Sequence, residues 1–156
     1  MRGIPLQFSP EDGCAPQAGV TLDKTGNVYG TTFQCGTFDW GTVFKIAPDN
    51  SETLLHSFNN DGTDGYGPQA GVLVLDNAGN IYGTTPMGGA GGWGTVFEFT
   101  PSGTETILHT FISDGVDGNQ PFGGVTFGDV NTLYGTTIGG GASGANNYGT
   151  VYKVVP

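Results

Sequence analysis

Short runs of apolar residues alternate with polar and glycine-rich turns along the whole chain. In the middle of the chain this pattern predicts four strands, at 70–76, 81–85, 94–100 and 105–111. Tight turns separate the first two and the last two, and a glycine-rich loop at 87–93 joins the second to the third. Four short strands joined in this way predict an antiparallel sheet like one blade of a β-propeller.

The predicted strands carry apolar residues on both faces. In the strand at 94–100, Phe97 and Phe99 point to one side, and Val96 and Glu98 point to the other. A sheet that is apolar on both sides must be covered on both sides. We therefore expect each sheet to lie between two neighbouring sheets.

The same pattern occurs three times, because the phrases Pro-x-x-Gly-Val, Tyr-Gly-Thr-Thr and Gly-Thr-Val recur in this order about every 50 residues. We expect a single repeat domain over residues 1–156. The expected repeats cover about 12–58, 61–111 and 114–156. The predicted fold class is all-β, a β-propeller with three four-stranded blades in each chain.

The third repeat ends at Pro156, after its third strand. The segment Ile4–Phe8 resembles a fourth strand, because it precedes Asp12-Gly13 much as Leu54–Phe58 precedes the next Asp-Gly pair. We expect this N-terminal strand to close the last blade and remove a free sheet edge. Since propellers have about four to eight blades, we expect a homodimer with six. An open end-to-end assembly and a fragment of a longer array are the alternatives.

The composition supports the predicted fold and limits the classes of partner that we expect the chain to bind. Thirty glycines with ten Phe, six Tyr and two Trp fit short strands and tight turns rather than disorder. Fourteen acidic and four basic residues give a net charge of −10. Nucleic acid and anionic membrane surfaces are poor partners for such a chain. No apolar run approaches the ~20 residues that cross a bilayer, and the first residues contain no signal-peptide core.

The phrases at 76–85, 88–89 and 94–97 read Asp-x-x-Gly-Asn-Ile-Tyr-Gly-Thr-Thr, Gly-Gly and Gly-Thr-Val-Phe. They resemble the GloVer-type tandem repeats of large bacterial surface or secreted proteins, over about nine-tenths of the chain. The chain departs from this pattern at 128–132, which puts one hairpin in question. The resemblance implies an extracellular or cell-surface, propeller-like repeat protein, and it implies no catalytic motif.

Two cysteines lie in the first repeat. An antiparallel blade brings the loops that carry Cys14 and Cys35 to the same end, so we expect a disulfide, which fits an oxidising compartment. Free thiols and a link between chains are the alternatives.

His56 and His109 occupy equivalent positions in two fourth strands, and neither has the spacing of a zinc motif. We interpret both histidines as structural.

The repeated phrase Asp-Gly-x-Asp-Gly places carboxylates two or three residues apart, as calcium sites do, and calcium is the only cofactor that the sequence suggests. The candidate ligands are Asp61, Asp64, Asp114 and Asp117. We favour the alternative, a turn in which Asp accepts hydrogen bonds from its own backbone and Gly adopts a positive φ.

An aromatic residue stands before Gly-Thr-Val in each repeat: Trp40, Trp93 and Tyr148. The glycine-rich loops before them differ, as expected of ligand-binding loops on one face of a rigid scaffold. Aromatic rings are platforms for sugars, and these three are the candidate ligand-binding residues. Packing between blades is the alternative role.

The expected function is a non-catalytic extracellular module that binds a glycan or a protein on this face. A self-assembling ring or fibre subunit is the alternative. A glycan hydrolase or lyase is a third hypothesis, with Asp39, Asp64 and Asp117 as its candidate carboxylates.

Overall fold

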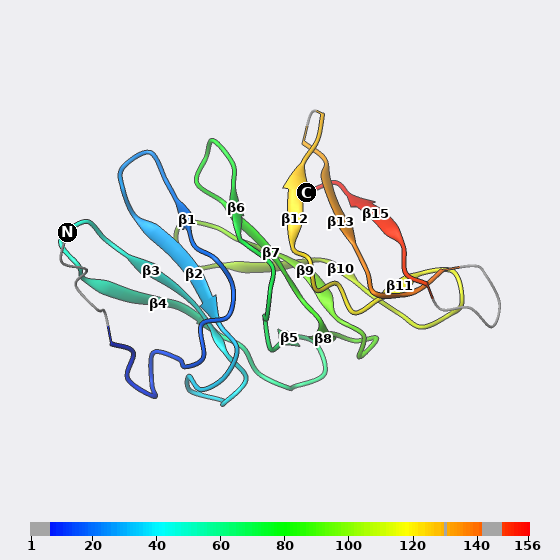
Figure 1. Ribbon diagram of the computed structural model, residues 1–156, viewed down its shortest axis with the longest axis horizontal. Helices are drawn as coiled ribbons and strands as arrows, with labels where there is room; N and C mark the ends of the chain where they lie inside the picture. The colour runs from blue at the N-terminus through cyan, green and yellow to red at the C-terminus, as the bar shows by residue number, and fades with distance from the viewer. Residues whose placement is uncertain (1–6, 130, 142–147) are drawn as a thin grey trace.

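The computed structural model describes residues 7–129, 131–141 and 148–156. These residues form strands, turns and loops, and none of them lies in a helix that could cross a membrane. Three antiparallel sheets follow one another along the long axis of the molecule, in chain order (Figure 1). The described part of the chain is therefore all-β, as predicted, and its sheets do not close into a barrel.

Each repeat contributes one main sheet. The first sheet contains β1 (Thr21–Leu22), β2 (Val28–Thr32), β3 (Thr42–Ile46) and β4 (Glu52–Ser57), in that order. The second contains β6 (Val74–Leu75), β7 (Ile81–Thr85), β9 (Thr95–Phe99) and β10 (Glu105–Thr110). The third contains β12 (Val125–Phe127), β13 (Leu133–Thr136) and β15 (Val151–Val154).

Two small two-stranded sheets lie beside the main ones. They pair β5 (Gly65–Tyr66) with β8 (Met87–Gly88), and β11 (Gly118–Asn119) with β14 (Gly139–Gly140). Each ties the start of a repeat to the glycine-rich loop of the same repeat.

The strand predicted at 70–76 is shorter than expected, since only Val74 and Leu75 pair with β7. Gly71 instead packs against the third sheet, where an added Cβ would lie 2.7 Å from Gly124 Cα. Glycine is required here because the two backbones approach so closely. The hairpin at 128–132 forms despite its unusual sequence, and Gly128 N–H donates to the Thr132 carbonyl over 2.8 Å.

The apolar core lies between the sheets rather than inside any one of them. One buried cluster joins the first and second sheets and includes Phe58, Phe97 and Phe99. A second cluster joins the second and third sheets and includes Val96 and Phe111. The second sheet is thus covered on both faces, and its strand β9 has the alternation that the sequence predicted.

Pairs of buried threonine hydroxyls explain two of the recurring phrases. The second threonine of Tyr-Gly-Thr-Thr lies 2.8 Å from the threonine of Gly-Thr-Val in all three repeats. The pairs are Thr32–Thr42, Thr85–Thr95 and Thr137–Thr150. Each pair joins two adjacent strands at the end of the sheet that leads into the glycine-rich loop.

The expected N-terminal strand can be followed only in part, since Ile4, Pro5 and Leu6 lie outside the described residues. Phe8 is described, and its ring packs edge-on against Phe44 with the centroids 4.9 Å apart. Phe58 and Phe97 are the corresponding residues one repeat later, and their rings also pack together, at 5.5 Å. Phe8 therefore covers the first sheet as the end of a preceding fourth strand would.

Candidate functional site

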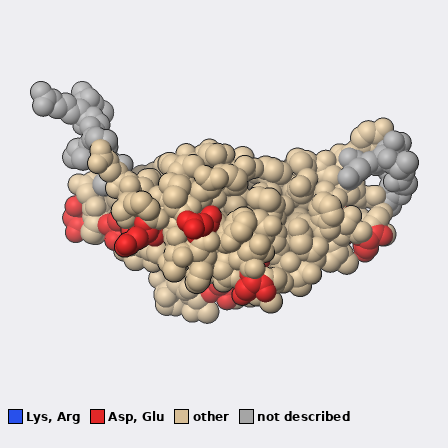
Figure 2. All heavy atoms as spheres, turned by 90° about the horizontal axis from the view of Figure 1, so that it is seen from below, with Lys and Arg blue, Asp and Glu red and all other residues tan. Residues whose placement is uncertain are grey.

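The variable loops gather at one end of the sheets. We call this surface the loop face, and it comprises the described residues of 33–41, 58–67, 86–94, 111–121 and 137–149. Backbone pairing between β5 and β8, and between β11 and β14, holds these segments together. Figure 2 views this end of the molecule and shows acidic side chains with no Lys or Arg in sight.

The three candidate aromatic residues are at least partly exposed on the loop face. The exposed fraction is 39% for Trp40, 41% for Trp93 and 79% for Tyr148. The Trp40 ring also packs on Tyr66 of the next repeat, with centroids 4.6 Å apart. Part of the Trp40 side chain is therefore packed between two repeats, as the alternative role required, and another part faces solvent.

The two tryptophans lie at the junctions between repeats. The Trp40 carbonyl accepts a hydrogen bond from Gly67 N–H, and the Trp93 carbonyl accepts one from Gln120 N–H, both over 2.9 Å. The structure therefore spaces the tryptophans along the loop face rather than collecting them in one pocket.

An open hollow of about 510 Å³ lies beside the first of these aromatic residues. Its lining consists of Phe38, Trp40, Asn59, Asn60 and Asp61. Two partly exposed aromatic rings thus stand opposite two amides and a carboxylate. This combination offers both flat apolar surface and hydrogen-bonding groups to a ligand.

The Asp-Gly segments form turns around their own carboxylates. Asp61 Oδ1 accepts hydrogen bonds from Asp64 N–H over 3.0 Å and from Thr63 N–H over 2.8 Å. These bonds hold the pKa of Asp61 at about 2. Asp114 Oδ1 accepts equivalent bonds from Val116 and Asp117, both over 2.8 Å. The geometry is that of the turn interpretation, and in Asp61 and Asp114 it is the Oδ1 atom that accepts these hydrogen bonds.

The second aspartate of each phrase faces a histidine. His56 Nε2 lies 2.9 Å from Asp64 Oδ2, and His109 Nε2 lies 3.1 Å from Asp117 Oδ2. The same Asp64 oxygen accepts a 3.0 Å hydrogen bond from Asn59 N–H. Each histidine thus holds the loop that follows its own strand. This contact fits the structural interpretation of both histidines.

Glu105 joins only the first of these pairs. It begins β10, and its Oε2 lies 3.6 Å from His56 Nε2 on the neighbouring sheet. Burial raises the pKa of Glu105 to about 7, and the nearby Asp64 carboxylate adds to this effect while His56 opposes it. Burial alone lowers the pKa of His56, but the hydrogen bond with Asp64 and the charge of Glu105 outweigh it, so the pKa is raised.

Sequence reasoning missed this cluster because its members come from two repeats. One feature of the sequence pointed to this cluster: a glutamate stands at the start of the fourth strand in both the first and the second repeat, at Glu52 and Glu105. Within the described ranges, His56, Asp64 and Glu105 are the one group of three potential metal ligands whose donor atoms all lie within 4.8 Å of one another.

The carboxylates considered for a hydrolase are placed apart from one another. Asp64 and Asp117 contact different histidines on different repeats. Asp39 lines a separate acidic hollow of about 570 Å³ together with Glu11 and Asp12.

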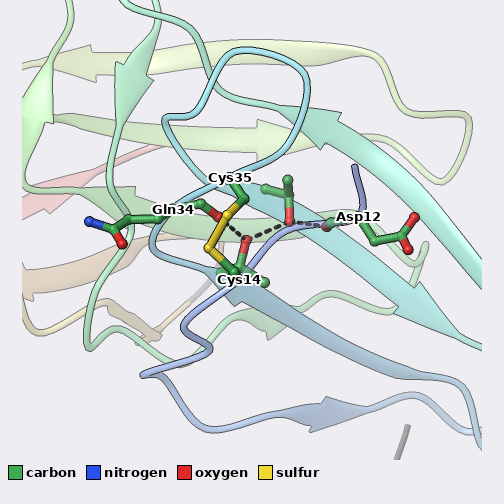
Figure 3. The surroundings of a disulfide bond; sticks show 6 residues. Asp12, Cys14, Gln34 and Cys35 are labelled. Carbon is green, nitrogen blue, oxygen red and sulfur yellow. Dashed lines mark hydrogen bonds between the residues drawn. A yellow bond between two sulfur atoms is a disulfide. The ribbon is translucent and has the colours of Figure 1, made fainter. Parts of the chain in front are cut away.

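Cys14 and Cys35 form a disulfide at the edge of the loop face, with their Cα atoms 5.3 Å apart (Figure 3). Cys14 also exchanges two backbone hydrogen bonds with Gln34, of 2.8 and 3.2 Å. The Thr32–Thr42 pair lies close to this bond, because the Thr32 hydroxyl contacts the Gln34 carbonyl and the Thr42 hydroxyl donates to the Asp12 carbonyl. The bond therefore fastens the start of the first repeat to its own glycine-rich loop.

A comparison with protein-family models gives a match to this chain. The family model described as the Gloeobacter/Verrucomicrobia repeat matches residues 4–156. No curated protein matches the chain.

Proposed function

The chain belongs to the Gloeobacter/Verrucomicrobia repeat family, and from this and from the loop face we propose that it is a non-catalytic, extracellular module that binds a glycan. The disulfide supports an oxidising location outside the cytosol. The three sheets serve in this proposal as rigid blades that present ligand-binding loops.

We interpret the sheets as blades of a β-propeller. Neighbouring sheets pack face to face through the two apolar clusters. The segments that lead into the first strands also contact the neighbouring repeat, through the approach of Gly71 to Gly124 and a hydrogen bond from the Thr21 hydroxyl to the Leu73 carbonyl. Sheets that pack face to face in chain order, each covering the next, are what a propeller requires of its blades.

The hollow beside Trp40 is the observation that supports glycan binding most directly. Sugars present CH groups to aromatic faces and hydroxyl groups to amides and carboxylates. Phe38 and Trp40 supply the rings, and Asn59, Asn60 and Asp61 supply the polar partners, in a single hollow. Trp40 is held in place by its contact with Tyr66, so little conformational entropy is lost when a ligand binds.

Recurrence of the aromatic residue favours a long or repetitive ligand. Trp93 is exposed at the position of Trp40 one repeat later, and Tyr148 is exposed two repeats later. Several weak sites on one rigid surface strengthen binding to a chain that reaches more than one of them.

A glycan array tests the proposal, followed by calorimetry with the best-binding oligosaccharide. The Trp40→Ala variant should bind about ten-fold more weakly, which corresponds to ~1.4 kcal/mol. Leu22→Ala is the matched control, because Leu22 is an exposed apolar residue outside the loop face. An array without hits, or a Trp40→Ala variant that binds like the control, would contradict glycan binding.

A second candidate function, self-assembly, is favoured by the open third sheet. That sheet has three strands in the described chain, whereas the first and second have four. Phe111 of the second sheet packs on Tyr152 of the third, just as Phe8 packs on Phe44 of the first. We propose that residues 1–8 of one chain supply the fourth strand of the third sheet of another, so that two chains make a six-bladed ring.

Light scattering tests this assembly. The intact chain should have the mass of a dimer, and a chain lacking residues 1–8 should lose the dimer or aggregate through its exposed edge. A monomeric intact chain, or a truncated chain that stays dimeric and equally stable, would rule out the strand exchange. A ladder of larger species that disappears on truncation would instead indicate an open fibre.

A further inference from the structure

The cluster of His56, Asp64 and Glu105 lies at the junction between the first and second sheets. His56 is part of β4, Asp64 lies in the loop that leads to β5, and Glu105 begins β10. One imidazole nitrogen and two carboxylate oxygens converge here, with separations of 2.9 Å and 3.6 Å measured from His56 Nε2. All three donor atoms lie within 4.8 Å of one another.

Two oxygens in this cluster are buried without a hydrogen-bond partner. They are Asp64 Oδ1 and Glu105 Oε1. The Asp64 side chain is only 5% exposed, and that of Glu105 is 20% exposed. Buried carboxylate oxygens without a partner are costly, and buried charges are normally paired or coordinate a metal. The other two oxygens, Asp64 Oδ2 and Glu105 Oε2, share His56 Nε2, and Asn59 N–H also donates to Asp64 Oδ2.

We propose that His56, Asp64 and Glu105 bind a divalent transition-metal ion, with Zn²⁺ the best fit. Ligand bonds of about 2.0–2.2 Å in a tetrahedral site place neighbouring donor atoms about 3.3–3.6 Å apart. The observed separations of 2.9 Å and 3.6 Å from His56 Nε2 are close to this range. The imidazole ligand favours zinc over calcium and magnesium, which prefer oxygen ligands.

Solvent can reach the cluster. The side chains of His56 and Glu105 are each 20% exposed, so a water molecule can complete a four-coordinate site. The ion would then join two repeats, because His56 belongs to β4 of the first sheet and Glu105 to β10 of the second. It would act as a clamp between neighbouring sheets, and this role does not depend on glycan binding.

Equivalent residues in the neighbouring repeats allow a comparison with this cluster within the same chain. His109 and Asp117 form the same pair one repeat later, but within the described ranges no third carboxylate joins them. Glu52 stands where Glu105 stands, at the start of its fourth strand, and it belongs to no such group in the described structure. A single metal ion per chain is therefore expected.

Metal analysis and calorimetry of the intact chain, first dialysed against chelator and then titrated with ZnCl₂, test the proposal. We expect one Zn²⁺ per chain and a melting temperature that rises with Zn²⁺ and falls again with chelator. His56→Gln and Glu105→Gln should each abolish this one-to-one binding. His109→Gln and Glu52→Gln are the matched controls and should leave it unchanged.

X-ray absorption of the zinc-loaded wild-type chain gives a reading that does not depend on how the variants fold. It should show one imidazole and oxygen ligands around the metal. A wild-type chain that takes up no stoichiometric Zn²⁺, or folded His56→Gln and Glu105→Gln variants that bind it like the controls, would overturn the proposal. Weak binding of several ions that all four variants share would likewise indicate adventitious surface binding only.

Discussion

The hydroxyl groups of Thr85 and Thr95 lie 2.8 Å apart in the core of the second sheet, and both side chains are fully buried. Thr85 also donates to the Met87 carbonyl over 3.0 Å. Thr95 must therefore donate to Thr85, since a hydroxyl group has one proton. The result is a short chain of hydrogen bonds that joins β7 to β9 and to the first residue of β8.

Thr85→Val should destabilise the protein by about 1–3 kcal/mol, because it leaves the Thr95 hydroxyl and the Met87 carbonyl buried without this partner. Chemical denaturation measures the loss. Thr106→Val, at the exposed position of β10, is the control and should stay close to wild type. Equal stability of the two variants would show that the hydroxyl chain contributes nothing.

Gly65→Ala should be destabilising by about 1–3 kcal/mol through overpacking. An added Cβ would overlap both the Thr85 and the Thr95 hydroxyls, so this pair leaves no room for it. Gly19→Ala is the control, because its added Cβ would meet only a Val72 methyl group at 3.2 Å. Thermal melting of both variants checks the prediction, and a Gly65→Ala variant at least as stable as Gly19→Ala would refute it.

Reduction of the Cys14–Cys35 bond should lower stability by about 3 kcal/mol in the chain-entropy model, since the bond closes a loop of about 20 residues. The sequence separation of the two cysteines is 21. The double variant Cys14→Ser/Cys35→Ser should melt at the temperature of the reduced wild type and should not respond to reductant. A reductant effect of equal size on that variant would mean that the wild-type effect has another source.

Asp76→Ala should destabilise the second sheet in a pH-dependent way. The Asp76 carboxylate accepts hydrogen bonds from Ala78, Asn80 and Tyr82 over 2.8–3.1 Å. Burial opposes ionisation, but these bonds outweigh it and lower the pKa of Asp76 below its usual value. A lowered pKa gives stability that is present above the unfolded-state pKa of about 3.9 and is lost as the pH falls through the folded-state pKa.

The difference in melting temperature between wild type and Asp76→Ala should therefore be largest near neutral pH and should shrink below about pH 3.9. Asp129→Ala is the control, because Asp129 is exposed in the corresponding hairpin of the third repeat. A difference that stays constant from pH 7 to acid pH would rule out the ionised carboxylate as its cause.

The local elements and their order could be predicted from the sequence. Strand alternation in β9, the turn at Asp61 and the grouping of loops on one face all follow from residues close together in the chain. Local backbone preference and side-chain alternation act over a few residues, and a repeat shows them three times. The strand expected at 70–76 was too long because the contact of Gly71 with Gly124, more than 50 residues away, is not a local property.

Contacts between different repeats could not be predicted in this way, because they arise from the packing of one sheet on the next. In the sequence, His56 and Glu105 belong to two different copies of the fourth strand. The packing of the first sheet on the second places His56 Nε2 3.6 Å from Glu105 Oε2. Trp40 and Tyr66 likewise belong to different repeats, and their ring contact fixes one wall of the hollow on the loop face. Such sites depend on the distance and angle between packed sheets, which the burial of both apolar clusters sets and no single repeat encodes.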